Sequence, residues 1–279
     1  MSEPLVFLPM ERWGELKSVF KSDWPRGISA YTTLDTAEHI VNNGADYGFK
    51  VYVPFGDLTN GLVALNLKGT FYEVVVLCPK DDTTELEDAL MRTKLIDWNR
   101  SFHIPFTPKN VSDLMKRIIT KKNLSSFSTI SVTDTFYYNK PPNFIVSLPT
   151  SFKFELLRME DAQIADDTWP HKHSGSVWYF KLLIKAKLGY GLYKNNELIA
   201  WCFVNEMGAL GHLYVVENHR RKGYGELVLK LISNTLAKEG KFVLAFCVVG
   251  NEGAKRLYQK LEFIQDEPVE WITVPVVPK

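Results

Sequence analysis

Two glycines follow three basic residues in the stretch ENHRRKGYGE, residues 217–226. The apolar run HLYVV precedes the stretch, and ELVLKLI, which has helical periodicity, follows it. A turn from strand to helix leaves the first amides of the helix without internal partners, at the positive end of the helix dipole. Gly223 and Gly225 remove side chains that would hold a ligand away from these amides. The sequence therefore predicts an anion site here.

The spacing separates this stretch from two other phosphate loops. A Walker loop needs Gly-Lys followed by Ser or Thr, and a dinucleotide fingerprint needs a third glycine beyond G-x-G. The pattern present is R-x-x-G-x-G, from Arg220 through Gly223 to Gly225. Short strings of this kind also arise by chance, so a solvated helix start with incidental arginines stays open as the alternative.

Composition excludes several classes of protein. The 279 residues include 33 basic and 32 acidic side chains, so no bulk attraction to nucleic acid or to an acidic membrane is expected. No apolar run approaches the ~20 residues of a membrane span. The cysteines, Cys78, Cys202 and Cys247, lie in separate apolar runs, which indicates buried reduced thiols. The N-terminus resembles neither a secretory signal nor a typical transit peptide, so we expect a cytoplasmic location.

A stretch with three prolines, 137–152, divides the predicted elements into two groups. In the first group, Ser112 is the predicted cap of a helix at 111–120. In the second, Asn195-Asn196 predicts a hairpin turn. The first group has helical spacing at 11–20, 86–95 and 111–120 and strands at 48–55 and 71–79. The second has helices at 160–169, 177–188, 226–240 and 251–263 and strands at 152–159, 189–194, 197–206, 209–216, 241–249 and 269–274. An antiparallel meander followed by strand–helix–strand–helix predicts a mixed sheet with helices on both faces.

A second motif, NEGAKRLYQKLEF at 251–263, follows the glycine-containing turn after one helix and one strand. Asn251 is its predicted helix cap, and Ala254, Leu257, Tyr258 and Leu261 line one face of the helix. Asn251 and Tyr258 are two helical turns apart, so both can face one ligand. Together the two motifs resemble those of the GNAT acyltransferases, in which R-x-x-G-x-G binds the pyrophosphate of coenzyme A.

A narrower resemblance, to the glycine N-acyltransferase-like family, extends over nearly the whole chain. It rests on AWCFVNEMG at 200–208 through VEWITVP at 269–275, and on LIDWNRSFHI at 95–104. It implies an α/β fold of the α+β type, in which helices flank a mixed, mostly antiparallel sheet, in two tandem GNAT domains. By the same resemblance, the mitochondrion is the alternative location.

The resemblance also implies how the domains divide. We expect a degenerate GNAT-like domain at 1–140, a linker at 141–152 and an acyl-CoA-binding GNAT domain at 153–279. The first part contains no R-x-x-G-x-G, which is consistent with a copy that does not bind the co-substrate.

The co-substrate that the resemblance implies is acyl-CoA, without a metal. Amides at 221–226 would bind its phosphates, and a splayed strand at 213–215 would bind pantetheine and offer an amide to the oxyanion. Tyr258 resembles the family's general acid, which protonates the departing thiolate, although a tyrosine can also simply pack a helix against a sheet. The expected CoA-binding residues are Leu213, Tyr214, Val215, Arg220, Arg221, Lys222, Gly223, Tyr224, Gly225, Glu226, Asn251, Ala254 and Tyr258.

The general base departs from the family pattern. Counting back from Arg220, the family's glutamate falls on Ala209, which cannot accept a proton. His212 is the first substitute, although strict alternation directs it to the other face of its strand unless the strand carries a bulge. Glu206 at the end of the preceding strand is the second. His171 and His173 lie in the segment where the family builds its acceptor pocket, but nothing completes a metal site around them.

The predicted function is the transfer of an acyl group from CoA to the amine of a small molecule, such as glycine or another amino acid, by direct attack in a ternary complex. No cysteine or serine nucleophile with a neighbouring base is evident. Two alternatives stay open: an acyl-CoA-binding sensor or scaffold that has lost catalysis, which Ala209 favours, and an acetyltransferase that acts on a protein amine. No nucleic acid partner and no membrane span are expected.

Overall fold

The computed structural model describes residues 2–68, 71–124 and 128–275. The N-terminal half contains β1 (Leu5–Leu8), α1 (Trp13–Lys21), α2 (Ile28–Asn42), β2 (Lys50–Pro54), β3 (Leu62–Lys68), β4 (Phe71–Leu77), α3 (Thr84–Arg92), β5 (Phe102–Thr107), α4 (Lys109–Lys121) and β6 (Ser128–Tyr137). The C-terminal half contains β7 (Phe152–Leu156), α5 (Asp161–Asp167), α6 (Val177–Lys185), β8 (Gly189–Lys194), β9 (Glu197–Val204), β10 (Ala209–Val215), α7 (Tyr224–Lys238), β11 (Leu244–Val248), α8 (Glu252–Lys260) and β12 (Ile264–Val274).

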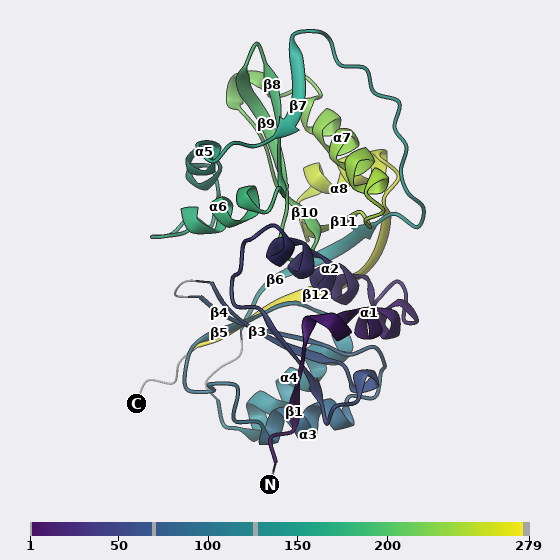
Figure 1. The fold of residues 1–279 in the computed structure, drawn as a ribbon, viewed down its shortest axis with the longest axis vertical. Helices are drawn as coiled ribbons and strands as arrows, with labels where there is room; N and C mark the ends of the chain where they lie inside the picture. Colours follow the sequence, from purple (N-terminus) through teal and green to yellow (C-terminus); the bar gives the residue numbers. More distant parts are fainter. Residues whose placement is uncertain (1, 69–70, 125–127, 276–279) are drawn as a thin grey trace.

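One sheet of twelve strands runs through both halves, in the order β1-β2-β3-β4-β5-β12-β6-β11-β10-β9-β8-β7. Most neighbouring strands are antiparallel, and the pairs β4–β5 and β10–β11 are parallel. The last strand of each half pairs with the other half: β12 lies between β5 and β6, and β6 lies between β12 and β11. Figure 1 shows the result as two lobes whose shared strands cross in the middle of the molecule. The mixed, mostly antiparallel sheet flanked by helices confirms the predicted fold class.

The core is also continuous across the halves. One cluster of buried side chains combines Leu34 and Ile40 of α2 with Phe203 of β9 and Ile232 of α7. A second lies within the N-terminal lobe and includes Ile272 of β12. Burial of this apolar area stabilises the lobes and also holds them together.

The stretch between β6 and β7 contains no helix or strand at residues 138–151, which the structure describes in full. In Figure 1 it runs along the outside of the C-terminal lobe. It is tied to α7 by two reciprocal bonds: the Phe144 amide donates to Asn234 Oδ1, and Asn234 Nδ2 donates to the Phe144 carbonyl, each at 2.8 Å. The domain boundaries remain a prediction.

Some of the predicted turns, caps and helix ends are confirmed and others are wrong. Asn195 and Asn196 both have positive φ, as a tight hairpin turn requires. The predicted cap at Ser112 is wrong: α4 begins at Lys109 after Pro108, whose fixed φ suits a helix start, and Ser112 is a buried residue of the helix interior. Helix α6 ends three residues before the predicted Leu188, where Lys187 takes a φ of 61°.

Candidate functional site

The turn between β10 and α7 presents free amides. Gly223 is the N-cap of α7 and has a φ of 81°, a left-handed conformation that glycine adopts without steric cost. No side chain caps this helix end, so the first amides of a fifteen-residue helix are available to an anion. A Cβ atom on Gly223 would meet nothing within 4 Å, so the requirement for glycine is conformational rather than steric. This arrangement is consistent with the predicted anion site.

The basic side chains of the turn fold back on it. Arg220 donates from Nε to the Val215 carbonyl at 3.1 Å, and its guanidinium lies 5.2 Å from the centre of the Tyr214 ring. Lys222 donates to the Asn218 carbonyl at 2.8 Å. Arg221 has a φ of 60°, which helps to form the turn. Arg220, which also pairs with Glu217 at 3.4 Å, and Lys222 therefore help to shape the turn.

The side chains at 224 and 226 are occupied by other contacts. The Tyr224 ring packs on Phe152, with centroids 5.6 Å apart. Glu226 forms ion pairs with Lys230 at 2.8 Å and Lys260 at 2.6 Å, which hold the pKa of its carboxyl below the usual range. A ligand at this turn would therefore meet the backbone of these residues. A side chain at Gly225 would lie against Val215 and Leu213, in the space between helix and strand.

A gap opens between β10 and β11. The two strands pair only at Ala209 with Leu244 and at Leu210 with Ala245, among the described residues. The other edge of β10 stays paired with β9 as far as Val215. On the side of β11, the backbone of Leu213–Val215 therefore faces a gap rather than a neighbouring strand, and the Val215 carbonyl there accepts from Arg220 Nε.

Strand β10 has a bulge that reorients His212. The register with β9 shifts between Gly211 and Tyr214, and His212 takes a φ of 53°. The His212 ring lies 6.0 Å from that of Phe203, the residue that pairs with Gly211, so it shares the face of Gly211. An unbroken strand would direct it to the opposite face. The bulge thus brings an imidazole to the face where a base is expected.

A hydrogen-bonded chain joins both candidate bases. Tyr179 of α6 donates its hydroxyl to Glu206 Oε2 at 2.5 Å, and His212 Nε2 lies 3.4 Å from the same hydroxyl oxygen. The Tyr179 hydroxyl therefore links the carboxylate of Glu206 to the imidazole of His212. Tyr179 was not predicted as a site residue, because in α6 it lies among apolar side chains and lysines, none of which indicates a polar site.

Tyr258 lies on the other face of the sheet. Its ring stacks on Phe136 of β6 with centroids 5.1 Å apart. Burial and then the nearby thiols of Cys202 and Cys247 raise the pKa of Tyr258, so the phenol stays protonated. Cys202 and Phe203 are neighbours in one strand and face opposite sides, so Tyr258 and His212 lie on opposite faces. A base on one face and an acid on the other can carry out the two proton transfers of a single reaction.

Ala209 is closed to any substrate. It is fully buried and packs with Ile28 of α2, Tyr137 of β6 and Leu244 of β11. A glutamate could not be accommodated there without moving α2. The missing base at this position is therefore a consequence of how the two halves pack.

The remaining predicted residues lie around these groups. Asn251 caps α8 through its Oδ1, which accepts from the Ala254 amide at 3.1 Å, as predicted from its position. His171 and His173 are exposed and flank Trp169, whose ring lies 5.6 Å from that of His212. Within the described ranges, no three His, Cys, Asp or Glu side chains form a metal-binding group. None of the helices described is long and apolar enough to cross a bilayer.

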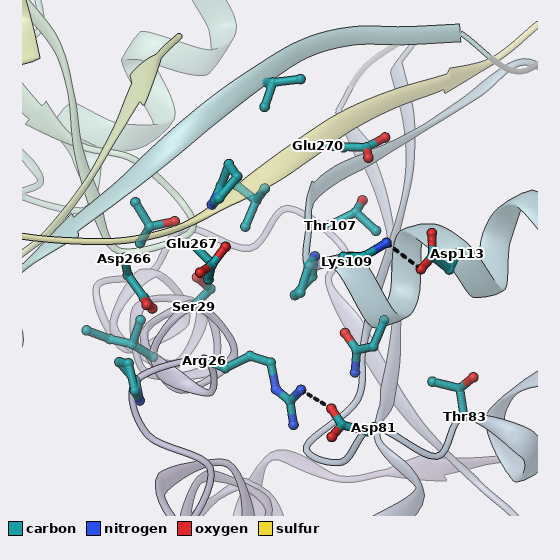
Figure 2. A pocket seen from close by; sticks show the side chains of 18 of the residues that line it. Arg26, Ser29, Asp81, Thr83, Thr107, Lys109, Asp113, Asp266, Glu267 and Glu270 are labelled. Atoms are coloured by element: carbon teal, nitrogen blue, oxygen red, sulfur yellow. Dashed lines mark hydrogen bonds and ion pairs between the residues drawn. The ribbon is translucent and has the colours of Figure 1, made fainter.

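In the N-terminal half, the corresponding turn is acidic, and a carboxylate occupies the helix start. Between β4 and α3, Asp82 Oδ1 accepts from the Thr84 amide at 3.0 Å and so occupies the helix start. Asp81 pairs with Arg26 at 2.5 Å. A cavity of about 850 Å³ adjoins this turn, lined by six carboxylates and three cationic side chains. Figure 2 shows Asp266 and Glu267 reaching it from β12. Such a surface repels phosphates.

Comparisons with known proteins agree with this geometry. The FR47-like protein family model matches residues 188–272, which hold β8 to β12 and the glycine-containing turn. A crystal structure of a Drosophila melanogaster protein from a structural genomics consortium matches with a TM-score of 0.84 and 22% identity, over 98% of this chain and 99% of that one. A tandem GNAT protein from the clavulanic acid biosynthesis pathway matches with a TM-score of 0.58 and 12% identity, over 99% of both chains.

The protein has a GNAT fold. A GCN5-related N-acetyltransferase from Kribbella flavida has the same fold, with a TM-score of 0.57 and 12% identity over 89% of this chain and 96% of that one. These neighbours share the fold with this chain, and the FR47-like match lies within its C-terminal half. No curated protein matches the sequence.

Proposed function

We propose that the protein transfers an acyl group from acyl-CoA to the amine of a small molecule. The observation that carries the proposal is the placement of His212 and Tyr258 on opposite faces of the sheet, where β10 and β11 separate beside an uncapped helix start. The GNAT fold together with the uncapped start of α7 supports the choice of CoA thioesters.

In the proposed complex, the amides at 221–226 hold the pyrophosphate, and the open edge of β10 at 213–215 hydrogen-bonds the pantetheine amides. A helix start and its field favour doubly charged phosphates. The thioester carbonyl then lies near the bulge, where a backbone amide stabilises the oxyanion that forms on attack. In this complex, Asn251 and Ala254 at the start of α8 would also contact the co-substrate.

The proposed chemistry needs one base and one acid. The His212 imidazole accepts the proton of the acceptor amine while the amine nitrogen forms its bond to the thioester carbon. The tetrahedral intermediate then releases its C–S bond, and Tyr258 protonates the thiolate. Glu206, through Tyr179, favours the imidazolium that forms on His212. The proton on His212 returns to the tyrosinate through solvent, so the protein ends unchanged.

No covalent enzyme intermediate is needed. Burial raises the pKa of the Cys202 thiol to about 12 and raises those of Cys78 and Cys247, so none of them is a ready nucleophile. The acceptor would approach from the loop at 168–176, which lies beside His212. The resemblance to the glycine N-acyltransferase-like family suggests an amino acid such as glycine as the acceptor.

Two measurements test the proposal. Thermal-shift titrations with acetyl-, butyryl- and benzoyl-CoA should raise the melting temperature in a concentration-dependent way. Thiol release with a panel of amino acids and other small amines should then exceed the rate without an amine. Binding without thiol release would favour an acyl-CoA sensor, and thiol release with protein amines alone would identify a protein acetyltransferase. Absence of any CoA response would overturn all three.

A further inference from the structure

Helix α2 of the N-terminal half packs along the C-terminal half. Ile28 at its start contacts Ala209 and Leu244, and the Tyr31 ring meets Phe242 at 5.2 Å. Near its end, His39 Nε2 lies 2.8 Å from the Ala186 carbonyl oxygen. These positions recur every three to four residues or their multiples, so one face of α2 meets the other half. In Figure 1, α2 lies against the lower ends of β10 and β11.

The centre of this contact is the turn at 205–208, which joins β9 to β10. The Thr32 hydroxyl lies 2.8 Å from the Met207 carbonyl oxygen, its nearest acceptor, and 3.0 Å and 3.3 Å from the Ile28 and Ser29 carbonyl oxygens of its own helix. Gly208 has a φ of 78°, and a Cβ atom on it would lie 2.7 Å from Thr32 Cβ and 2.9 Å from the Thr32 carbonyl oxygen. The backbone of the turn therefore packs directly against α2 at Gly208, where there is no room for a side chain. The turn is held from outside by α2.

The same turn is also rigid from within. Asn205 Oδ1 accepts from the amides of Met207 at 3.1 Å and Ala209 at 3.0 Å, and the Gly208 amide donates to the Asn205 carbonyl at 2.9 Å. A displacement of Met207 would thus carry the whole turn, including Glu206. Glu206 accepts the 2.5 Å bond from Tyr179, the residue that contacts His212.

The N-terminal half also encloses this polar chain. Tyr47 is buried, and its hydroxyl has no hydrogen-bond partner in the described part of the protein. Burial and then the charges of Glu206 and Glu73 raise the pKa of Tyr47, so both carboxylates lie near it. Glu73 comes from β4, and Asn66 of β3 donates to it at 3.3 Å. Two lobes thus contribute buried polar groups around Glu206.

We propose that α2 is a positioning element for the base of the C-terminal half, and that Thr32 acts by fixing the turn that holds Glu206 against Tyr179 and His212. The effect on catalysis rests on the proposed function, but the effect of Thr32 on the position of the turn can be measured without substrate. The N-terminal half, which has no amide-rich turn, would then be needed for turnover rather than for CoA binding.

The groups that face His212 determine in which direction its pKa should change. Tyr179 and Glu206 form the chain, Glu73 and Tyr47 lie behind them, and the exposed His171 and His173 lie beyond Trp169. A well-placed carboxylate favours the protonated imidazole. Loss of the Thr32–Met207 bond moves Glu206 away, so His212 should release its proton at lower pH. A short hydrogen bond is sensitive to such displacement.

The test compares Thr32→Val with Thr33→Val in the full chain. Thr33 is also buried on α2, but its hydroxyl donates within the helix to the Ser29 carbonyl at 2.7 Å. The ring titration of His212 is followed by NMR, assigned with His212→Gln. We expect Thr32→Val to lower the titration midpoint by about half a pH unit and Thr33→Val to leave it unchanged. Gly208→Ala, if it folds, should act like Thr32→Val.

Kinetics with acetyl-CoA and the best amine found give the second readout. Thr32→Val should lower kcat roughly tenfold and move the acid limb of the pH profile to lower pH, with the apparent affinity for acetyl-CoA unchanged. Equal His212 titrations in the two threonine variants would overturn the positioning role. If the wild-type protein releases no thiol, the proposed function fails, while the ring titration still decides whether α2 positions this chain.

Discussion

The two halves of the molecule repeat one order of elements. Each consists of a strand, two helices, three strands, a helix, a strand, a helix and a strand, from β1 to β6 and from β7 to β12. The sheet is symmetric in the same sense: from one end it runs β1 to β5 and then β12, and from the other β7 to β11 and then β6. Each half completes its sheet with the last strand of the other.

The halves differ where the fourth strand of each meets its helix. In the C-terminal half, a left-handed glycine caps α7 and leaves its amides open. In the N-terminal half, the Asp82 carboxylate binds the Thr84 amide at the start of α3. Seven residues after the cap of the next helix, the C-terminal half has Tyr258 and the N-terminal half has Met115, which has no proton to give.

This difference distinguishes the residues that determine the fold from those that are proposed to bind the ligand. The fold depends on apolar patterning, which both halves have, whereas the proposed ligand site depends on a few residues at helix starts, which only the C-terminal half has. The N-terminal half still contributes through α2, which covers Ala209 and holds the turn that carries Glu206.

The largest expected effect comes from giving the C-terminal turn the charge of the N-terminal one. Gly223→Glu places a carboxylate and a strained φ where phosphates would bind, so binding of acetyl-CoA should be lost in calorimetric titration. Gly240→Glu is the matched control, because Gly240 has a φ of 70° beyond the other end of α7. Retained affinity in Gly223→Glu would show that the turn is not the site.

Removing the proposed acid should reduce turnover next. Tyr258→Phe makes this position resemble its N-terminal counterpart, which lacks a donor, and kcat for thiol release should fall about 100-fold. Affinity for acetyl-CoA should change little. Tyr193→Phe, another buried tyrosine whose hydroxyl bonds Asp161 at 2.7 Å, should leave kcat near the wild-type value. Equal losses in both variants would indicate a packing role for Tyr258.

A smaller effect is expected when the carboxylate behind the base loses its charge. Glu206→Gln keeps the size of the side chain and an oxygen acceptor, but no longer favours the imidazolium on His212. We expect kcat/KM to fall roughly tenfold and the acid limb of its pH profile to move to lower pH. A profile unchanged in position would remove Glu206 from the chain of residues that supports the base.

The smallest effect is expected from a feature that both halves have, a glutamate paired with two basic side chains. Glu87 of α3 pairs with Arg117 and Lys121 of α4, as Glu226 pairs with Lys230 and with Lys260 of α8. These ion pairs lower the pKa of both carboxyls, although burial opposes this and is the largest influence at Glu87. The stability they contribute is therefore present above the unfolded pKa and is lost as pH falls through the folded pKa.

We expect Glu87→Gln and Glu226→Gln to lower the melting temperature slightly and similarly at pH 7. The difference from the wild-type protein should vanish as the pH falls below about 4. A loss that persists in acid would mean that packing, rather than charge, accounts for it.

The sequence predicted the C-terminal half better than the N-terminal half, for local reasons. Its turn residues, apolar strands and helix cap, such as Asn195-Asn196 and Asn251, act within a few residues of themselves. Helix α2 was not predicted, because its buried residues include three threonines, poor helix formers, and surround the helix instead of forming one stripe. Burial against the other half stabilises it.

The proposed chain from Glu206 through Tyr179 to His212 shows a second limit of prediction from sequence. The sequence suggested His212 and Glu206 singly, but the bulge that reorients His212 and the Tyr179 hydroxyl that joins them depend on residues 27 and 33 positions apart. The exchange of β6 and β12 is equally invisible to local patterns, because no strand was predicted at 128–137 and the pattern at 269–274 does not say which strand it pairs with. Contacts between distant segments decide which polar residues meet.

The central claim is that one half binds acyl-CoA and the other does not. Isothermal titration of the full chain with acetyl-CoA measures the number of sites directly. The account predicts one site per chain, which disappears in Gly223→Glu. Two sites, or one site that survives this substitution, would contradict it.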